Sequence, residues 1–240
     1  MNNLNICYKN LTQKITFNHL QLFPQINIDL ERDYLLYSTI HKEFDHDTWN
    51  YYLNLLPKHL HNGVMKYHKW EDRHNTLIGK LLIDIGYHMM YGRKLNFDKF
   101  LRNDYGKPFL QDHSDFKFNI SHSTNMVVCA FSKQLIGIDI EEVKKIDLEG
   151  FSSVFSSIEL RKIEQGGGLR FYEFWTTKEA VVKAIGKGLT IPLLDINVFD
   201  DYARYDNMNW FKQNIIFENY YCTVVSQVKE KKINVLKVEF

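Results

Sequence analysis

The chain has 240 residues, of which 45% are hydrophobic and 25% are charged, a composition that excludes disordered, collagen-like and low-complexity proteins. Lysine and arginine number 30 against 29 aspartates and glutamates, so we do not expect a protein that binds nucleic acid through a broad basic surface. The three cysteines lie far apart, which predicts a reduced, cytoplasmic protein without a disulfide framework. No signal peptide is expected, and no apolar run approaches the roughly 20 residues of a membrane helix.

Two helix patterns are visible before residue 100. Asp47 and Thr48 can cap a short helix that stops at Pro57. A stronger pattern follows, because apolar residues recur at helical spacing over residues 77–89 and Gly92 lies just beyond them. We assign this apolar stripe to core packing.

From residue 116 the apolar period changes from helical to alternating. Residues 116–120 predict a strand that runs into a turn at Ser121–Asn125. Met126–Phe131 and Leu135–Glu141 predict a second and a third strand. Together the three strands predict an antiparallel meander.

The second half of the chain repeats the order of helix followed by strands. Apolar spacing predicts a helix over residues 174–185, and Gln165 with the three glycines at 166–168 predicts a flexible surface loop before it. We therefore expect an α+β fold of two similar halves, residues 1–134 and 135–240. Short strand patterns complete the second half at residues 196–199, 215–217, 221–225 and 233–238.

An acidic pair lies in the third of the predicted strands. Alternation places Asp139 and Glu141 on one face, about 6.6 Å apart, and three isoleucines on the other. If the acidic face is open to solvent, nothing further follows. If it is enclosed, the two carboxylates need a cation, for which Mg²⁺ or Mn²⁺ is suited. Gly137 on the same face leaves room for a ligand.

A Glu–Lys pair lies on the predicted helix of the second half. Glu179 and Lys183 are four residues apart and share a helix face. One interpretation is a surface ion pair worth a few tenths of a kcal/mol. The other is a third carboxylate for the metal beside a lysine that meets phosphate oxygen.

Ser121 and His122 are adjacent, which could suggest a hydrolase. Neighbouring residues of a strand point in opposite directions and no Gly-x-Ser-x-Gly segment is present, so a serine nucleophile is not expected. His122 suits a polar clamp on an anion. A histidine that satisfies its own turn is an equal alternative.

Four segments in this order resemble the 4'-phosphopantetheinyl transferases, specifically the two-half, surfactin-synthetase-activating type. Similarity covers about residues 60–195, and it is weaker at Asp72 and residues 76–79. The four segments are Tyr105–Pro108, Phe118–Ser123, Gly137–Glu141 and Phe174–Gly188.

The resemblance implies two halves related by a pseudo-two-fold axis, with the active site in the cleft between them. The first half would hold the nucleotide side of coenzyme A and the second the metal and the catalytic side. Asp139, Glu141 and Glu179 would bind Mg²⁺, with Mn²⁺ as an alternative. Where some family members carry a third carboxylate between the first two, this chain has Ile140, which cannot be a ligand.

The resemblance also assigns the substrate. Lys183 would lie at the pyrophosphate of coenzyme A, and Glu179 is the candidate general base. A serine of an apo acyl or peptidyl carrier protein would receive the phosphopantetheine, releasing 3',5'-ADP. The nucleotide end would contact Lys107, His122, Ser121, Gly106, Pro108 and Thr76, whereas no basic residue of 58–73 can be assigned to the 3'-phosphate.

Two other functions are compatible with these residues. Carboxylates beside a lysine also suit a metal-dependent phosphodiesterase or nuclease, although the near-neutral charge argues against it. A non-catalytic module that binds carrier proteins has no need of the acidic residues and Lys183. We expect a monomeric transferase with no nucleic-acid or membrane partner.

Overall fold

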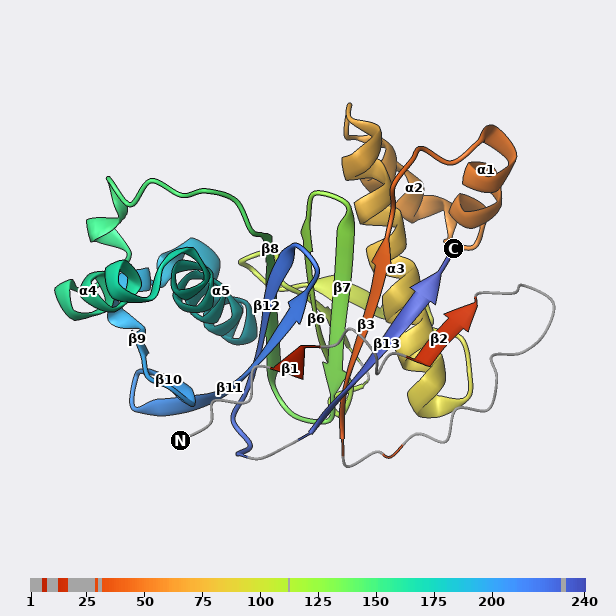
Figure 1. Cartoon of the computed structure of the whole chain (residues 1–240). Helices are drawn as coiled ribbons and strands as arrows, with labels where there is room; N and C mark the ends of the chain where they lie inside the picture. The colour runs from red at the N-terminus through yellow and green to blue at the C-terminus, as the bar shows by residue number, and fades with distance from the viewer. Residues whose placement is uncertain (1–5, 8–12, 17–28, 30–31, 112, 230–231) are drawn as a thin grey trace.

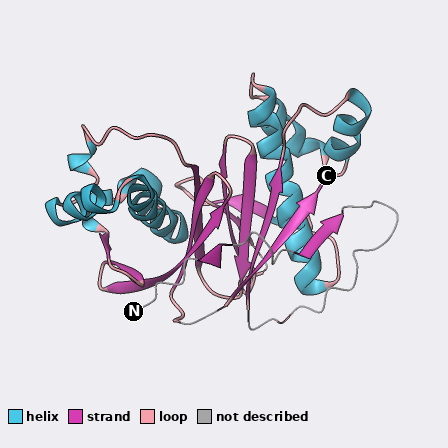
Figure 2. Cartoon of the chain, in the orientation of Figure 1, coloured by secondary structure: helices cyan, strands magenta, loops and turns pink. Residues whose placement is uncertain are grey.

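Two large sheets pack face to face between two long helices, and two short strands form a separate hairpin. The computed structural model describes residues 6–7, 13–16, 29, 32–111, 113–229 and 232–240. Helix α3 (Trp70–Tyr91) covers the outer face of the first sheet and α5 (Gly168–Ile185) the outer face of the second (Figures 1 and 2). Helices and sheets are both present, so the predicted α+β class is confirmed.

Strands near the two chain ends lie in the sheet of the opposite half: β1 (Ile6–Cys7) from the start of the chain lies in the second sheet, and β13 (Ile233–Glu239) from its end lies in the first. The first has the order β2 (Gln13–Thr16), β13, β3 (Asp33–Thr39), β7 (Met126–Ser132) and β6 (Lys117–Ser123). The second has the order β8 (Ile136–Glu142), β12 (Tyr220–Ser226), β11 (Met208–Phe217), β10 (Tyr202–Tyr205) and β9 (Asn197–Val198), with β1 parallel to β11. Because β13 joins the first sheet, the sheets do not follow the expected division at 134/135, which stays a prediction.

The remaining elements lie at the two ends of the molecule and between them (Figure 1). Helices α1 (His46–Asn54) and α2 (Lys58–Met65) pack beside α3, and α4 (Ser157–Gly166) packs beside α5. Strands β4 (Phe100–Arg102) and β5 (Pro108–Leu110) form a small hairpin, and four 3₁₀ turns span Phe97–Lys99, Phe151–Ser153, Gly188–Thr190 and Leu193–Asp195. Within the described part of the chain, no helix is both long and apolar enough to cross a membrane.

Side chains from both sheets form a core that joins them. Leu35 and Val128 of the first sheet belong to one buried cluster with Ile138, Ile140 and Val224 of the second. The isoleucines of β8 therefore face the first sheet, and the acidic residues of β8 face α5. This confirms the predicted alternation along β8.

The helix predictions hold in their centres and fail at some ends. Helix α3 starts at Trp70, earlier than its apolar stripe, and ends at Gly92, whose φ of 66° is the left-handed conformation that glycine adopts readily. Helix α1 is capped by Asp45, whose carboxylate accepts a hydrogen bond from the Thr48 amide (2.8 Å). The predicted caps at Asp47 and Thr48 are therefore wrong by a few residues.

Three further local predictions are wrong. The strand β6 continues through Ser123, so the turn begins only at Thr124. Strand β8 does not complete a meander with β6 and β7, because it pairs with β12 in the other sheet. Residues 165–168 form no loop: α4 ends at Gly166 and α5 starts at Gly168, with one residue between them.

Side chains of β6 connect the two sheets at one edge. Asn119, Ser121 and Ser123 alternate along β6 and point toward the edge of β8. Their side-chain oxygens accept hydrogen bonds from the amides of Ile138 (3.0 Å), Ile140 (3.4 Å) and Glu142 (3.0 Å), respectively. The unpaired edge of β8 is thus satisfied by side chains rather than by another strand.

Helix α5 lies very close to β8. A Cβ atom at Gly137 would overlap the carbonyl oxygen of Ala180. The space that we expected to admit a ligand is filled by the helix, and glycine is required there for packing. This close approach brings the acidic face of β8 against the side chains of α5.

Candidate functional site

A buried carboxylate at the contact between β8 and α5 forms the centre of the site. The Oδ1 atom of Asp139 accepts hydrogen bonds from Lys183 Nζ (2.5 Å) and Ser121 Oγ (2.9 Å). Lys183 also donates to Ser121 Oγ (2.8 Å). Asp139 is 3% exposed, and within the part of the chain that the structure describes its buried Oδ2 atom has no hydrogen-bond partner. Three residues predicted for the site are therefore in direct contact.

Two more carboxylates lie within electrostatic reach of Asp139. Burial raises the pKa of Glu141, and the charge of Asp139 raises it further. Burial and then Asp139 also raise the pKa of Glu179, against the opposing effect of Lys183. Glu141 is held in place by Ser123 Oγ (3.1 Å) and Trp175 Nε1 (3.4 Å). Three acidic groups thus lie around Lys183, and burial together with the charge of Asp139 disfavours the charged forms of the two glutamates.

This arrangement has the character of a cation site that is only partly assembled. Among the residues that the structure describes, no three His, Cys, Asp or Glu side chains are grouped closely enough to hold a metal ion. Burial is the main cause of the raised pKa values of Glu141 and Glu179, and repulsion from Asp139 adds to it. An additional positive charge would oppose both effects and would give the Oδ2 atom of Asp139 a partner. The donor set, oxygen atoms alone, suits Mg²⁺ or Mn²⁺.

A cavity of about 350 Å³ lies beside this acidic centre, between α3, the β4–β5 hairpin, β6 and α5. Lys183 connects the two, because it lines the cavity while its ammonium binds Asp139. Ser121 is not among the lining residues and lies behind Lys183. The cavity brings together Thr76, Gly106, Lys107, Pro108, His122 and Lys183, all of which were candidate site residues.

His122 lies in this cavity with a lowered pKa. Burial is the largest cause, and the charge of Lys183 adds to it, while Asp72 and Asp139 act in the opposite direction. The imidazole is therefore neutral at pH 7 and offers one N–H donor. Its predicted role as an anion clamp is compatible with this position and stays a prediction.

Besides lining the cavity, Lys107 makes a contact that the sequence did not suggest. Its Nζ donates to the carbonyl oxygen of Ala184 at the end of α5 (2.6 Å). Burial, and to a lesser extent Lys117, lowers the pKa of Lys107 to about 8. The side chain borders the cavity as expected, but its ammonium also caps a helix.

Two further cations line the cavity and were missed. Lys80 follows Thr76 by four residues and so shares its face of α3, a spacing that could have identified it. Burial, and then Arg102 and Lys66, lowers the pKa of Lys80 to about 8. Arg102 reaches the cavity from β4. The positive charges of Lys80 and Arg102 repel each other, so an anion bound at this end of the cavity would be stabilised by both.

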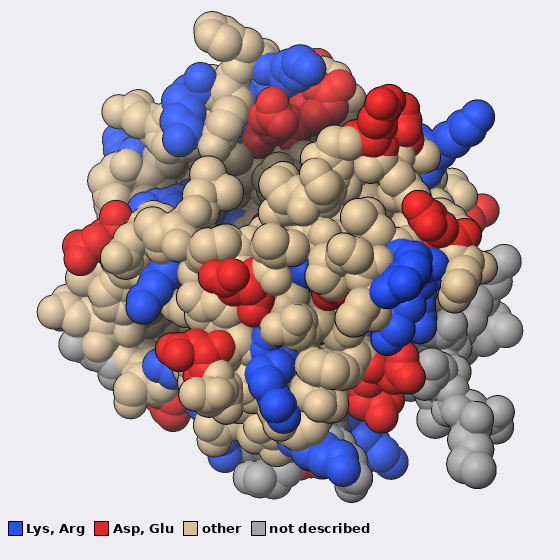
Figure 3. All heavy atoms as spheres, turned by 90° about the vertical axis from the view of Figure 1, so that its left-hand side faces the viewer, with Lys and Arg blue, Asp and Glu red and all other residues tan. Residues whose placement is uncertain are grey.

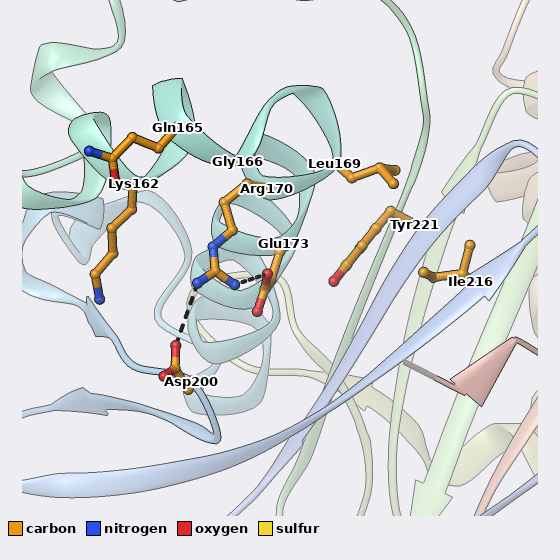
Figure 4. Close-up of a pocket in the computed structure, with 9 residues that line it drawn as sticks. All are labelled: Lys162, Gln165, Gly166, Leu169, Arg170, Glu173, Asp200, Ile216 and Tyr221. Atoms are coloured by element: carbon orange, nitrogen blue, oxygen red, sulfur yellow. Dashed lines mark hydrogen bonds and ion pairs between the residues drawn. The ribbon is translucent and has the colours of Figure 1, made fainter. Parts of the chain in front are cut away.

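A larger cavity, of about 530 Å³, lies on α4, α5 and the second sheet and contains none of the candidate residues. Arg170 bridges Glu173 (2.6 Å) and Asp200 (3.5 Å) in its wall (Figure 4). Glu173 also binds the buried Lys212 (2.5 Å). The two carboxylates in the wall of this cavity thus already have positively charged partners. We therefore do not assign it as the functional site on the basis of its size.

The end of the molecule that carries α4 and α5 has no surface of a single charge. Figure 3 shows this face with lysines and arginines interspersed among aspartates and glutamates. The mixture agrees with the near-neutral total charge.

Comparisons with known proteins identify the family. Residues 43–134 match the family model described as 4'-phosphopantetheinyl transferase, N-terminal. Residues 135–226 match the model of the 4'-phosphopantetheinyl transferase superfamily. The chain belongs to this superfamily. The resemblance seen in the sequence is thereby confirmed, and the two matched segments of this transferase family meet between residues 134 and 135.

Curated relatives within the 4'-phosphopantetheinyl transferase superfamily agree. The chain is 42% identical to the 4'-phosphopantetheinyl transferase Sfp of Bacillus subtilis over 136 residues, which cover 55% of this chain and 60% of Sfp. It is 32% identical to the 4'-phosphopantetheinyl transferase gsp of Aneurinibacillus migulanus over 222 residues, or 85% of this chain and 92% of gsp. The match to Sfp thus spans less than two thirds of that relative, and the match to gsp spans most of it.

Proposed function

We propose that the chain transfers the 4'-phosphopantetheine group of coenzyme A to a serine of an apo acyl or peptidyl carrier protein. The observation that carries this proposal is the contact of Lys183 with Asp139 at the wall of a cation-lined cavity, in a chain of this superfamily. One side of that lysine faces space for a ligand and the other faces three carboxylates. A phosphoryl-transfer site needs this combination of anion binding and charge neutralisation.

Positive charges at two places in the cavity support coenzyme A as the substrate. Lys183 lies beside His122 and Asp139 at one end. Lys80 and Arg102 interact with each other in a separate group. Coenzyme A also has two anionic parts, a pyrophosphate and a 3'-phosphate on the adenosine. We assign the pyrophosphate to the Lys183 end and the 3'-phosphate to the Lys80 end.

Asp139, Glu141 and Glu179 would hold Mg²⁺, with Mn²⁺ as an alternative. The ion, when bound, would neutralise charge on the phosphates as the leaving group departs. The unpartnered Oδ2 of Asp139 and the raised pKa values of the two glutamates support this assignment.

Lys183 and Glu179 have different roles in the proposed reaction. The carrier serine Oγ attacks the β-phosphorus of coenzyme A, the bond from that phosphorus to the bridging oxygen breaks, and 3',5'-ADP leaves. Lys183 donates to a phosphate oxygen and stabilises the charge that develops there. Glu179 takes the serine proton as the general base, directly or through a water molecule.

Every residue in this assignment comes from one chain. The cavity is lined by α3, the hairpin, β6 and α5 of the same molecule. We therefore propose that the monomer is the active form.

Intact-protein mass spectrometry tests the reaction. An apo carrier protein is incubated with the chain, coenzyme A and Mg²⁺, and a parallel sample contains EDTA. We expect the carrier to gain one phosphopantetheine only in the sample with free metal. No gain on several unrelated carriers, together with no coenzyme A binding, would refute the proposal; cleavage of DNA or RNA in Mg²⁺ would favour a nuclease instead.

A further inference from the structure

The last turn of α5 is held by residues that come from a distant part of the chain. The helix ends at Gly186, whose φ is 77° and whose amide donates to the Val182 carbonyl (2.8 Å). The final carbonyl oxygens of a helix have no partner within the helix, and they must be satisfied from elsewhere. Lys183 lies in this turn, so whatever holds the turn also holds Lys183.

Three side chains supply the missing donors. Lys107 Nζ donates to the carbonyl of Ala184 (2.6 Å), and a lysine is also favourable at the negative end of a helix dipole. Asn119 Nδ2 donates to the carbonyl of Lys183 (3.4 Å). Asn103 Nδ2 donates to the carbonyl of Gly186 (2.8 Å). The hairpin between β4 and β5 thus contributes two of the three contacts.

Asn103 also organises the hairpin loop from which it projects. Its Oδ1 atom accepts hydrogen bonds from the amides of Tyr105 (3.0 Å) and Lys107 (2.8 Å). Its backbone amide donates to the Lys107 carbonyl (3.0 Å), and its carbonyl accepts from the Gly106 amide (2.9 Å). The oxygen of the side chain therefore shapes the loop, and the nitrogen joins the loop to α5.

The hairpin and the helix are also in tight contact. A Cβ atom at Gly186 would overlap Cδ of Lys107 and lie 3.4 Å from Asn103 Nδ2. The same loop provides Tyr105, Gly106 and Pro108 to the cavity wall. A shift of the loop would therefore change the cavity and the last turn of α5 together.

We propose that Asn103 is a positioning residue that holds the last turn of α5 against the hairpin and so sets the placement of Lys183 between Asp139 and the cavity. The proposal rests on the proposed function, in which Lys183 binds phosphate. Asn103 touches neither the acidic centre nor Lys183 itself; it acts through Gly186 and the helix end.

The variant Asn103→Asp separates the two roles of the side chain. The aspartate retains an oxygen for the amides of Tyr105 and Lys107 and loses only the donor to Gly186. It also places a negative charge beside a carbonyl oxygen at the helix end, which is unfavourable. Asn96→Asp is a matched control, because Asn96 Oδ1 accepts from the Asp98 amide (3.0 Å) within its own turn and makes no such contact with α5.

We expect Asn103→Asp to lower kcat by about tenfold, less than the roughly 100-fold that a misplacement of about 1 Å can cost, and to leave KM for the carrier unchanged. Asn96→Asp should match the wild type. A double-mutant cycle with Lys183→Met provides the decisive comparison: if Asn103 acts through Lys183, Asn103→Asp causes little further loss in that background. A wild-type kcat for Asn103→Asp, or the same fold loss with and without Lys183, would overturn the proposal.

Hydrogen exchange tests the contact without any transfer assay. The amides of the last turn of α5 should exchange faster in Asn103→Asp than in the wild type and in Asn96→Asp. Unchanged exchange would show that Asn103 does not hold the last turn of α5, even if the enzyme is active. A wild-type protein that modifies no carrier and binds no coenzyme A would instead refute the proposed function, while the exchange result would still decide whether Asn103 holds the helix.

Discussion

Lys178 and Lys183 lie on the same helix but have different surroundings, and substituting Lys178 should damage the fold rather than the chemistry. Lys178 is fully buried, and its Nζ donates to Glu159 Oε2 (3.0 Å) and to the carbonyls of Leu193 (3.0 Å) and Ile196 (2.7 Å). Burial lowers the pKa of Lys178, and the charge of Glu159 opposes that shift. Lys178→Met keeps a similar volume and removes all three donors.

The expected loss follows from what remains. Glu159 is 5% exposed, and without Lys178 the hydrogen bonds that remain to it among the described residues come from Ser156 and the Val198 amide. Removing one partner of a buried ion pair costs about 3–5 kcal/mol. Since a domain of ordinary stability unfolds with about 5–15 kcal/mol, this is a large fraction of the total.

Urea denaturation followed by circular dichroism measures the effect. Lys178→Met should shift the transition to much lower urea, and the double variant Lys178→Met/Glu159→Gln should recover part of the loss, because the stranded charge is gone. Lys144→Met is the control, since Lys144 forms an exposed ion pair with Glu142 and its loss should not be measurable. A single Lys178→Met variant as stable as the wild type would refute the argument.

Three further outcomes are expected. Asp139→Ala should abolish phosphopantetheine transfer while circular dichroism shows a folded protein; normal turnover in Mg²⁺ would exclude Asp139 as a metal ligand. Lys80→Met should raise KM for coenzyme A much more than KM for dephospho-coenzyme A, and equal effects on both would remove Lys80 from the 3'-phosphate. Because the pKa of Lys80 is lowered to about 8, its charge is present below that pH and lost above it. KM for coenzyme A should therefore rise between pH 7 and 9 in the wild type, and rise less in Lys80→Met. Gly137→Ala should lower the free energy of unfolding by about 1–3 kcal/mol or more, measured by urea denaturation, because the added methyl group overlaps the Ala180 carbonyl; an unchanged midpoint would show that α5 can move away.

Features that depend on neighbouring residues could be predicted from the sequence. The apolar spacing of α3 and α5 and the glycines that end them are local signals, and both helices are present. The alternation in β8 also assigned its isoleucines and its carboxylates to opposite faces correctly.

Features that depend on residues far apart in the sequence could not be predicted in this way. Strand β8 pairs with β12, about 80 residues later, and nothing in its own alternation distinguishes that partner from β7. Strand β3 is almost entirely buried, so it lacks the alternation that identifies a half-exposed strand. Residues 165–168 were misread because a tight corner between two helices and a flexible loop share the same composition.

The candidate site follows the same division. The acidic residues and Lys183 were identified by motif and spacing, but their contact depends on Gly137 allowing α5 to approach β8. Asn103 has no motif that identifies it, because its partner is a backbone carbonyl more than 80 residues away. The roles of these residues in the reaction stay predictions until variants are measured.

The packing of α5 has a consequence for how the site can be altered. One face of the helix presents Lys183 to Asp139, and its last turn is held by Asn103, Lys107 and Asn119. Asn119 therefore takes part both in joining the two sheets, through the Ile138 amide, and in holding the turn that carries Lys183. A substitution that loosens this junction should lower activity before it lowers stability, because the chemistry depends on sub-ångström placement whereas the fold is also supported by three buried cores.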